Sequence, residues 1–109
     1  MGKRVLAGDQ KTEKRDEQTV VRTRVLIGGL VQGVGFRAYT QRQAQQGRLS
    51  GWVRNLPDGR VETEVQGSRP AIDAFVAALR KGPYLSRVDT IEIEWMEVGG
   101  QDTGFHILD

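Results

Sequence analysis

The first clear pattern along the chain is an alternation of apolar and polar residues with a period of two. Between residues 20 and 28, one set of alternate positions holds apolar residues or threonine and the other includes two arginines, namely Val21, Thr23, Val25 and Ile27 against Arg22 and Arg24. A period of two is typical of a strand that buries one face. We therefore predict a strand over 20–28.

Two later segments have the spacing of a helix. Residues 37–46 carry a weak apolar stripe, and Gly47 follows as a stop signal. The second helix has a stronger pattern, because Ser68 can cap it, Pro70 falls in its first turn and Gly82-Pro83 ends it. Its apolar positions repeat at i, i+3, i+4 and i+7, namely Ile72, Phe75, Val76 and Leu79.

A turn sequence, Pro57-Asp58-Gly59, separates two further strand segments. Residues 51–56 and 60–66 flank it, so we predict an antiparallel hairpin. A fourth strand is predicted where Ile91, Ile93 and Trp95 alternate with polar residues, and 105–108 can add a short fifth strand.

These elements follow the order βαββαβ, which is the split βαβ, ferredoxin-like arrangement. Because the strands have one polar face, we expect an α+β fold, a two-layer α/β sandwich with two helices on one face of an antiparallel sheet. One domain is expected over 20–109, preceded by a polar, disordered tail over 1–19. The same architecture supports many activities, so the site must decide the function.

The amino-acid composition and charge of the chain argue against several classes of function. The 109 residues are enough for one self-sufficient core, and the chain has no cysteine for a disulfide, a nucleophile or a metal site. No apolar run approaches the roughly 18 residues of a membrane span, and there is no signal-peptide core, so we expect a cytoplasmic protein. The net charge of +2 is small and does not by itself indicate nucleic-acid binding.

The connection between the first strand and the first helix is rich in glycine. Residues 29–37 read Gly-Leu-Val-Gln-Gly-Val-Gly-Phe-Arg. Successive backbone N–H groups from Val31 to Arg37 can bind one phosphate at the start of a helix, and Arg37 can add bidentate recognition. Alternatively, the glycines only make a tight crossing and Arg37 is solvated, and the loop alone does not decide between the two.

Residues 33–38 also match the dinucleotide-binding pattern G-x-G-x-x-[GA]. That pattern requires a following parallel strand that ends in an acidic residue. Here the second strand ends at Asn55-Leu56 and turns back as a hairpin, so we interpret the match as coincidental.

The same loop carries a family resemblance. The segment Ile27-Gly28-Gly29-Leu30-Val31-Gln32-Gly33-Val34-Gly35-Phe36-Arg37 resembles the first signature of the acylphosphatase family. A second segment, Gly51-Trp52-Val53-Arg54-Asn55 followed by Gly59, Val61 and Gly67, resembles the second signature of the same family. The resemblance extends over 20–109 and includes a ferredoxin-like fold.

This resemblance implies hydrolysis of acyl phosphates, which are carboxylic–phosphoric anhydrides, to a carboxylate and inorganic phosphate, without a metal or an organic cofactor. It implies that Asn55 orients the attacking water, and that the phosphate is bound by Arg37 and by the backbone of Val31, Gln32, Gly33, Val34, Gly35, Phe36 and Arg37. The implied partner is a small acyl phosphate, with no nucleic acid and no membrane, and a monomer is the default expectation.

Elementary chemistry is compatible with these roles. A carboxylate is a weakly basic leaving group, so positioning and charge stabilisation can carry much of the reaction. Asn55 can equally be a strand-end residue that satisfies the turn, although the split βαβ topology can bring it close to the loop. His106 lies in the C-terminal strand, away from the loop, and is expected to be structural or solvent-facing.

Two other functions remain open at this point. A non-catalytic module could hold phosphate in the same cradle. An RNA-binding domain would need paired aromatic residues and a basic stripe on the open sheet face, where only Trp52 and Trp95 are candidates. We expect both tryptophans to pack in the core or on the sheet surface.

Overall fold

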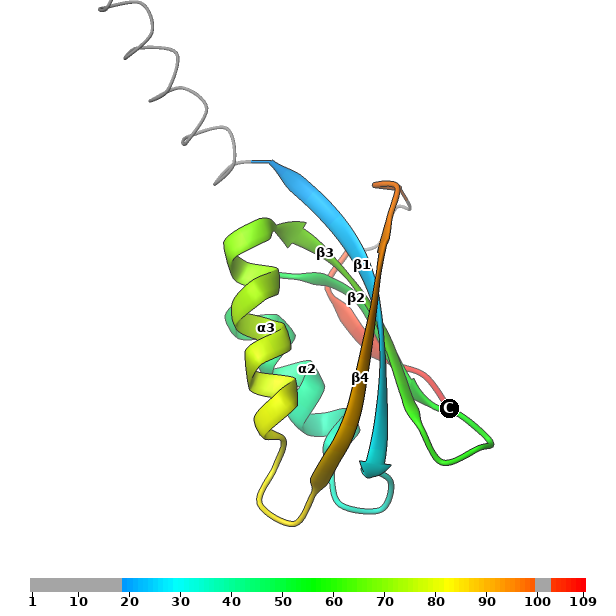
Figure 1. The fold of residues 1–109 in the computed structure, drawn as a ribbon. Helices are drawn as coiled ribbons and strands as arrows, with labels where there is room; N and C mark the ends of the chain where they lie inside the picture. Colours follow the sequence, from blue (N-terminus) through cyan, green and yellow to red (C-terminus); the bar gives the residue numbers. More distant parts are fainter. Residues whose placement is uncertain (1–18, 100–102) are drawn as a thin grey trace, which may run out of the picture.

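The elements of the chain occur in the predicted order. The computed structural model describes residues 19–99 and 103–109. Within these ranges the elements are β1 (Val20–Leu30), α2 (Phe36–Gln46), β2 (Ser50–Asn55), β3 (Val61–Ser68), α3 (Arg69–Lys81), β4 (Arg87–Met96) and β5 (Phe105–Ile107) (Figure 1). Apart from Thr19, the tail predicted over 1–19 lies outside the described residues.

The strands form one sheet with the order β4-β1-β3-β2-β5. The pairs β1–β3, β1–β4 and β2–β3 are antiparallel, as predicted, whereas β5 pairs with β2 in parallel. The four main strands therefore form the expected antiparallel sheet, and the short fifth strand, whose direction the sequence does not predict, adds one parallel pair that makes the sheet mixed. The reason is that β5 joins the edge opposite to β4 and runs in the direction of β2.

Both helices pack on the same face of the sheet, as Figure 1 shows, so the predicted two-layer sandwich is confirmed. The core lies between the layers and consists of strand and helix residues that are almost fully buried, among them Val25, Ile27, Val53, Val61, Val65, Phe36, Ile72, Phe75 and Leu79. Burying each such side chain contributes about 1.5–3 kcal/mol. No helix in the described ranges is long and apolar enough to span a bilayer.

Local signals set the ends of α3. The Ser68 hydroxyl accepts a hydrogen bond from the Ala71 N–H at 3.3 Å, which confirms the predicted cap. At the other end Gly82 donates its N–H to the Ala78 carbonyl at 2.9 Å. The helix therefore ends where the sequence predicts.

The first strand is two residues longer than predicted, because it extends to Leu30 along β4. Its register with β4 shifts between Gly28 and Gly29, which is the position of a β-bulge. Its last pair with β3 is Ile27–Val61. Beyond that pair the end of β1 follows β4 alone and leads into the glycine-rich loop.

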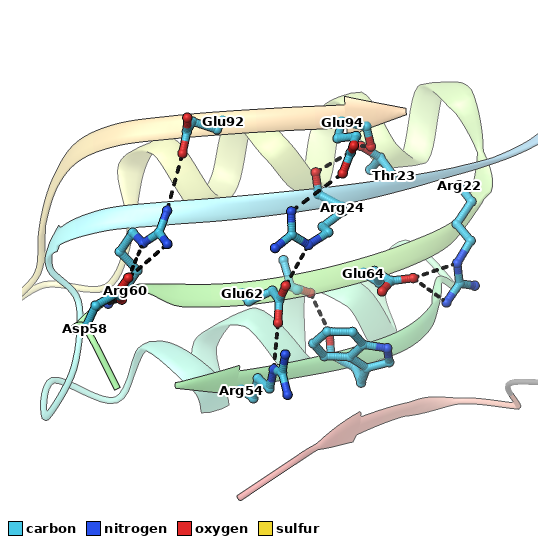
Figure 2. A network of polar contacts seen from close by, with 12 residues as sticks. Arg22, Thr23, Arg24, Arg54, Asp58, Arg60, Glu62, Glu64, Glu92 and Glu94 are labelled. Atoms are coloured by element: carbon cyan, nitrogen blue, oxygen red, sulfur yellow. Dashed lines mark hydrogen bonds and ion pairs between the residues drawn. The ribbon is translucent and has the colours of Figure 1, made fainter. Parts of the chain in front are cut away.

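The face of the sheet without helices carries a network of ion pairs (Figure 2). Glu62 of β3 accepts hydrogen bonds from Arg24 of β1 and Arg54 of β2, each at 2.6 Å. Arg22 pairs with Glu64 at 2.9 Å. The acidic side chains of β3 are thus engaged in ion pairs, and the Glu62 side chain is only 4% exposed.

Candidate active site

The loop of residues 31–35 connects the end of β1 to the start of α2. Gly33 and Gly35 have left-handed φ values of 76° and 78°, which glycine adopts without the strain that other residues incur. A Cβ at either position would meet nothing within 4 Å, so the space beside both glycines is open. The loop therefore needs glycine for its backbone conformation, and it leaves room for a ligand.

The first turn of α2 is suited to an anion. Gly35 is its N-cap, no side chain caps the helix, and the first turn contains no acidic residue. The first backbone N–H groups of a helix lack intrahelical partners, and the helix dipole adds partial positive charge there. Since no carboxylate neutralises this end, it can bind a phosphate.

A cavity of about 210 Å³ lies at this end of the helix. It is lined by Val31, Gly33, Gly35, Phe36, Arg37, Ala38, Asn55 and Ile107. The structure thus brings together Arg37, Asn55 and most of the predicted loop residues. Two predicted loop residues do not line the cavity: the Gln32 side chain bonds to the hairpin, and Val34 packs against the core.

Asn55 is the last residue of β2 and pairs with Val61. The turn that follows is closed without it, because the Leu56 N–H donates to the Arg60 carbonyl at 2.8 Å and the Asp58 carboxylate accepts from the Arg60 N–H at 3.0 Å. The Asn55 Oδ1 atom is buried and accepts no hydrogen bond from any described residue. A buried polar atom without a partner is uncommon, and here it belongs to a residue that lines the cavity.

Arg37 lies in the first turn of α2, and its Nη1 donates to the Leu108 carbonyl oxygen at 3.4 Å. A guanidinium has five N–H donors, so this contact leaves most of them for a ligand. Leu108 is held in turn by the hydrogen bond from its N–H to the Val53 carbonyl at 2.8 Å. The sequence did not indicate that Ile107 and Leu108 adjoin the site, since this depends on the parallel pairing of β5 with β2.

The histidine is not part of this cavity. His106 is exposed on β5, and its Nε2 lies 2.9 Å from the Thr103 carbonyl oxygen. This placement agrees with the predicted structural or solvent-facing role. Residues 19–99 and 103–109 contain no group of three histidine or acidic side chains that could hold a metal ion.

The two tryptophans lie on opposite faces of the sheet. Trp52 lies under the Arg54 guanidinium, 5.3 Å from the ring centroid, on the face with the ion pairs. Trp95 contacts Arg69 at 4.3 Å, and Arg69 begins α3 on the helical face. The two rings therefore do not form the paired aromatic platform that an RNA-binding sheet would need.

Comparisons with known proteins agree with this architecture. A family model described as acylphosphatase matches residues 23–107. The acylphosphatase of Chloroflexus aurantiacus is 44% identical over 89 residues, which cover 82% of this chain and 97% of that protein. The acylphosphatase of Anaeromyxobacter dehalogenans is 49% identical over 90 residues, covering 80% and 94%. The crystal structure of the acylphosphatase from Bacillus subtilis superposes with a TM-score of 0.80 at 36% identity, covering 82% of this chain and 99% of that one.

Proposed function

The chain belongs to the acylphosphatase family and hydrolyses acyl phosphates, and on this premise we propose the roles that its own residues have in the reaction. In this proposal the loop of residues 31–37 and the Arg37 side chain bind the phosphate, and the Asn55 side chain orients the attacking water. The observation that carries the proposal is the shared cavity of Arg37, the loop glycines and the unpartnered Oδ1 atom of Asn55.

In this proposal, two sources of positive charge at the cavity bind the phosphate. The uncapped start of α2 supplies backbone N–H groups, and the positive φ values of Gly33 and Gly35 shape the loop in front of them. Arg37 supplies a permanently charged planar fork that fits two phosphate oxygens. Because all of these groups are held by the fold before substrate binds, little reorganisation is needed in the transition state.

Asn55 is the group that places the water. Asn55 lines the cavity, and its carboxamide can hydrogen-bond a water molecule there, which leaves a lone pair of the water oxygen for the phosphorus atom. The water oxygen forms a bond to phosphorus, the bond from phosphorus to the acyl oxygen breaks, and the carboxylate leaves with the electron pair. An amide is a poor proton acceptor, so the water proton passes to a phosphate oxygen of the substrate.

The residues that line the cavity also favour direct attack by water. The described residues that line it include no histidine, serine, threonine or acidic side chain that could serve as a nucleophile or a general base. The carboxylate leaving group requires little protonation, so the reaction does not need a strong general acid. The proposed mechanism therefore uses no covalent intermediate, no metal and no cofactor.

The test of the water-positioning role is Asn55→Ala. We expect kcat for benzoyl phosphate to fall on the order of 10²- to 10³-fold, a loss comparable to that of one oriented hydrogen bond in the transition state, while inhibition by inorganic phosphate changes little. His106→Ala serves as the control, because His106 lies outside the cavity, and its kcat should be unchanged. Equal losses of kcat and of phosphate affinity in Asn55→Ala would contradict the role, and sensitivity to EDTA would contradict the metal-free mechanism.

We further propose that the protein acts as a cytoplasmic monomer without a nucleic-acid partner. The chain has no cysteine and a net charge of only +2. The edge strand β4 carries Glu92 and Glu94, whose side chains are 70% and 67% exposed, and charged edge positions oppose edge-to-edge pairing of two copies. Light scattering of the purified protein tests the monomer, and a mass of twice 12.1 kDa would contradict it.

A further inference from the structure

The Gln32 side chain connects the glycine-rich loop to the β2–β3 hairpin. Its Nε2 donates to the Leu56 carbonyl oxygen at 2.8 Å and to the Arg60 carbonyl oxygen at 2.9 Å. Both acceptors are carbonyl oxygens, so the orientation of the carboxamide is unambiguous, with the NH₂ group toward the hairpin. The two acceptors follow Gln32 by 24 and 28 residues in the chain, so this is a tertiary contact.

The hairpin does not need Gln32 to close its own turn. The Leu56 carbonyl already accepts from the Gly59 N–H at 3.1 Å, and the Arg60 carbonyl already accepts from the Leu56 N–H at 2.8 Å. A carbonyl oxygen has two lone pairs, and Gln32 uses the second one on each. The contact therefore does not complete the turn but ties the turn to the loop.

The contact lies beside Asn55. Leu56 directly follows Asn55, and Arg60 directly precedes Val61, which is the register partner of Asn55. The ladder between β1 and β3 has already ended at Ile27–Val61, so it does not tie residues 31–35 to the hairpin. Within the described part of the chain, the two Gln32 bonds are the side-chain hydrogen bonds that join this loop to the hairpin turn.

We propose that Gln32 is a positioning residue whose side chain sets the distance between the phosphate-binding loop and Asn55. This inference rests on the roles proposed above for the loop and for Asn55. The Gln32 side chain does not touch the substrate in this account, since it points at the hairpin and does not line the cavity. It acts through Asn55, so its loss impairs the attack of water and leaves phosphate binding largely intact.

The experiment begins with Gln32→Met, which keeps a similar length and removes both N–H donors. A displacement on the order of 1 Å in a catalytic site can cost about 10²-fold in rate, so we expect kcat for benzoyl phosphate to fall by roughly 10- to 100-fold. The inhibition constant for inorganic phosphate should change by less than about threefold, because in this proposal the substitution disturbs only the position of the water. Equal losses of kcat and of phosphate affinity, or an unchanged kcat, would overturn the proposal.

Two further variants separate positioning from a general structural effect. In the Asn55→Ala background, Gln32→Met should have little additional effect on kcat, because the residue that it positions is absent; fully additive effects would overturn the proposal. Gln32→Lys retains a donor long enough to reach the two carbonyls and should recover most of the kcat lost in Gln32→Met. Equal kcat losses in the Met and Lys variants would contradict the proposal.

The matched control is Gln66→Met at the far end of β3. The Gln66 Oε1 accepts from the Gly99 N–H at 3.0 Å and from Arg22 Nη1 at 3.3 Å, so this substitution also removes two tertiary hydrogen bonds of a glutamine but does not touch the cavity. Its kcat should match that of the unmodified protein.

The variants also distinguish failure of the two proposals. If Asn55→Ala alone keeps full kcat, the role proposed for Asn55 fails. If Asn55→Ala loses kcat and Gln32→Met does not, only the role of Gln32 fails.

Discussion

The Arg37 guanidinium, at the start of the first helix, donates a hydrogen bond to the backbone carbonyl of Leu108, just beyond the last strand, at 3.4 Å. The same Leu108 donates its N–H to Val53 of β2, so the C-terminal segment connects the strand that carries Asn55 to the Arg37 side chain. The conformation of the guanidinium is thus coupled to how well β5 is held on the edge of the sheet.

This coupling predicts that Leu108→Pro weakens substrate binding. Proline removes the N–H that bonds to Val53, so the Leu108 carbonyl is no longer held beside Arg37. Loss of one hydrogen bond to a charged group on an exposed site is worth about 1 kcal/mol, so we expect KM to rise roughly 3- to 10-fold. Leu108→Ala keeps both backbone groups and should leave KM unchanged; a similar KM in the two variants would show that the backbone contact does not matter.

Arg37 itself should be irreplaceable, even by another cation. Arg37→Ala should nearly abolish turnover, and Arg37→Lys should lower kcat/KM by about 10²-fold or more, because an ammonium cannot reproduce the planar fork that binds two phosphate oxygens. Steady-state kinetics with acetyl phosphate or benzoyl phosphate measure both effects.

Arg42→Ala is the matched control for this prediction. Arg42 is exposed on the same helix and does not line the cavity, so the substitution removes one positive charge without touching the site. It should change kcat/KM by less than about twofold, since exposed charges are screened by salt. High activity in Arg37→Lys would mean that charge alone suffices, against the bidentate role.

Gly35 should tolerate asparagine better than alanine. Its φ of 78° lies in the left-handed region, which costs a residue with a Cβ about 1–2 kcal/mol, and asparagine visits that region more readily than alanine does. A Cβ at this position meets no atom within 4 Å, so the cost is conformational and not steric. Urea unfolding should therefore rank the stabilities as Gly35, then Asn, then Ala; equal stability of the Ala variant would contradict the strain argument.

Much of the fold could be predicted because its signals are local. The Ser68 cap, the turn at Pro57-Asp58-Gly59 and the apolar positions of α3 each depend on neighbours within about one turn of helix or one hairpin. The cradle of Gly33, Gly35 and Arg37 is local in the same sense. The proximity of Asn55 to that cradle could also be predicted, since it follows from the order of the strands in a split βαβ arrangement.

Other features could not be predicted because they depend on residues far apart in the chain. The bonds from Gln32 to Leu56 and Arg60 and the bond from Arg37 to Leu108 involve separations of 24, 28 and 71 residues. The alternation of residues shows that Glu62 is on the polar face, but not which residues are opposite to it. Only the register of three strands places Arg24 and Arg54 on either side of this carboxylate (Figure 2).

That register has a consequence for stability. Burial of Glu62 opposes its ionisation, but the hydrogen bonds and charges of Arg54 and Arg24 outweigh burial, so the pKa of Glu62 is lowered from its ordinary value of 4.5. A carboxyl group whose pKa is lower in the folded state stabilises the fold above its unfolded pKa, and this contribution is lost as the pH falls through the folded pKa. The free energy of unfolding should therefore decline on acidification from about pH 5 downward.

Glu62→Gln tests this account. The substitution leaves two guanidiniums without their shared carboxylate, which should lower the free energy of unfolding at pH 7 by about 1–3 kcal/mol, less than for a fully buried pair because both arginines are partly exposed. The control is Glu92→Gln, which should cost less than about 1 kcal/mol, because the Glu92 carboxylate is 70% exposed and lies 3.5 Å from Arg60.

Urea unfolding of the Glu62→Gln variant at pH 7 and at pH 3 measures the loss of stability and its dependence on pH. The deficit relative to the unmodified protein should shrink at pH 3, because below pH 4.5 protonation of Glu62 in the unfolded chain already removes part of the stabilisation. A deficit that is independent of pH would mean that packing, and not the charge of Glu62, stabilises this face of the sheet.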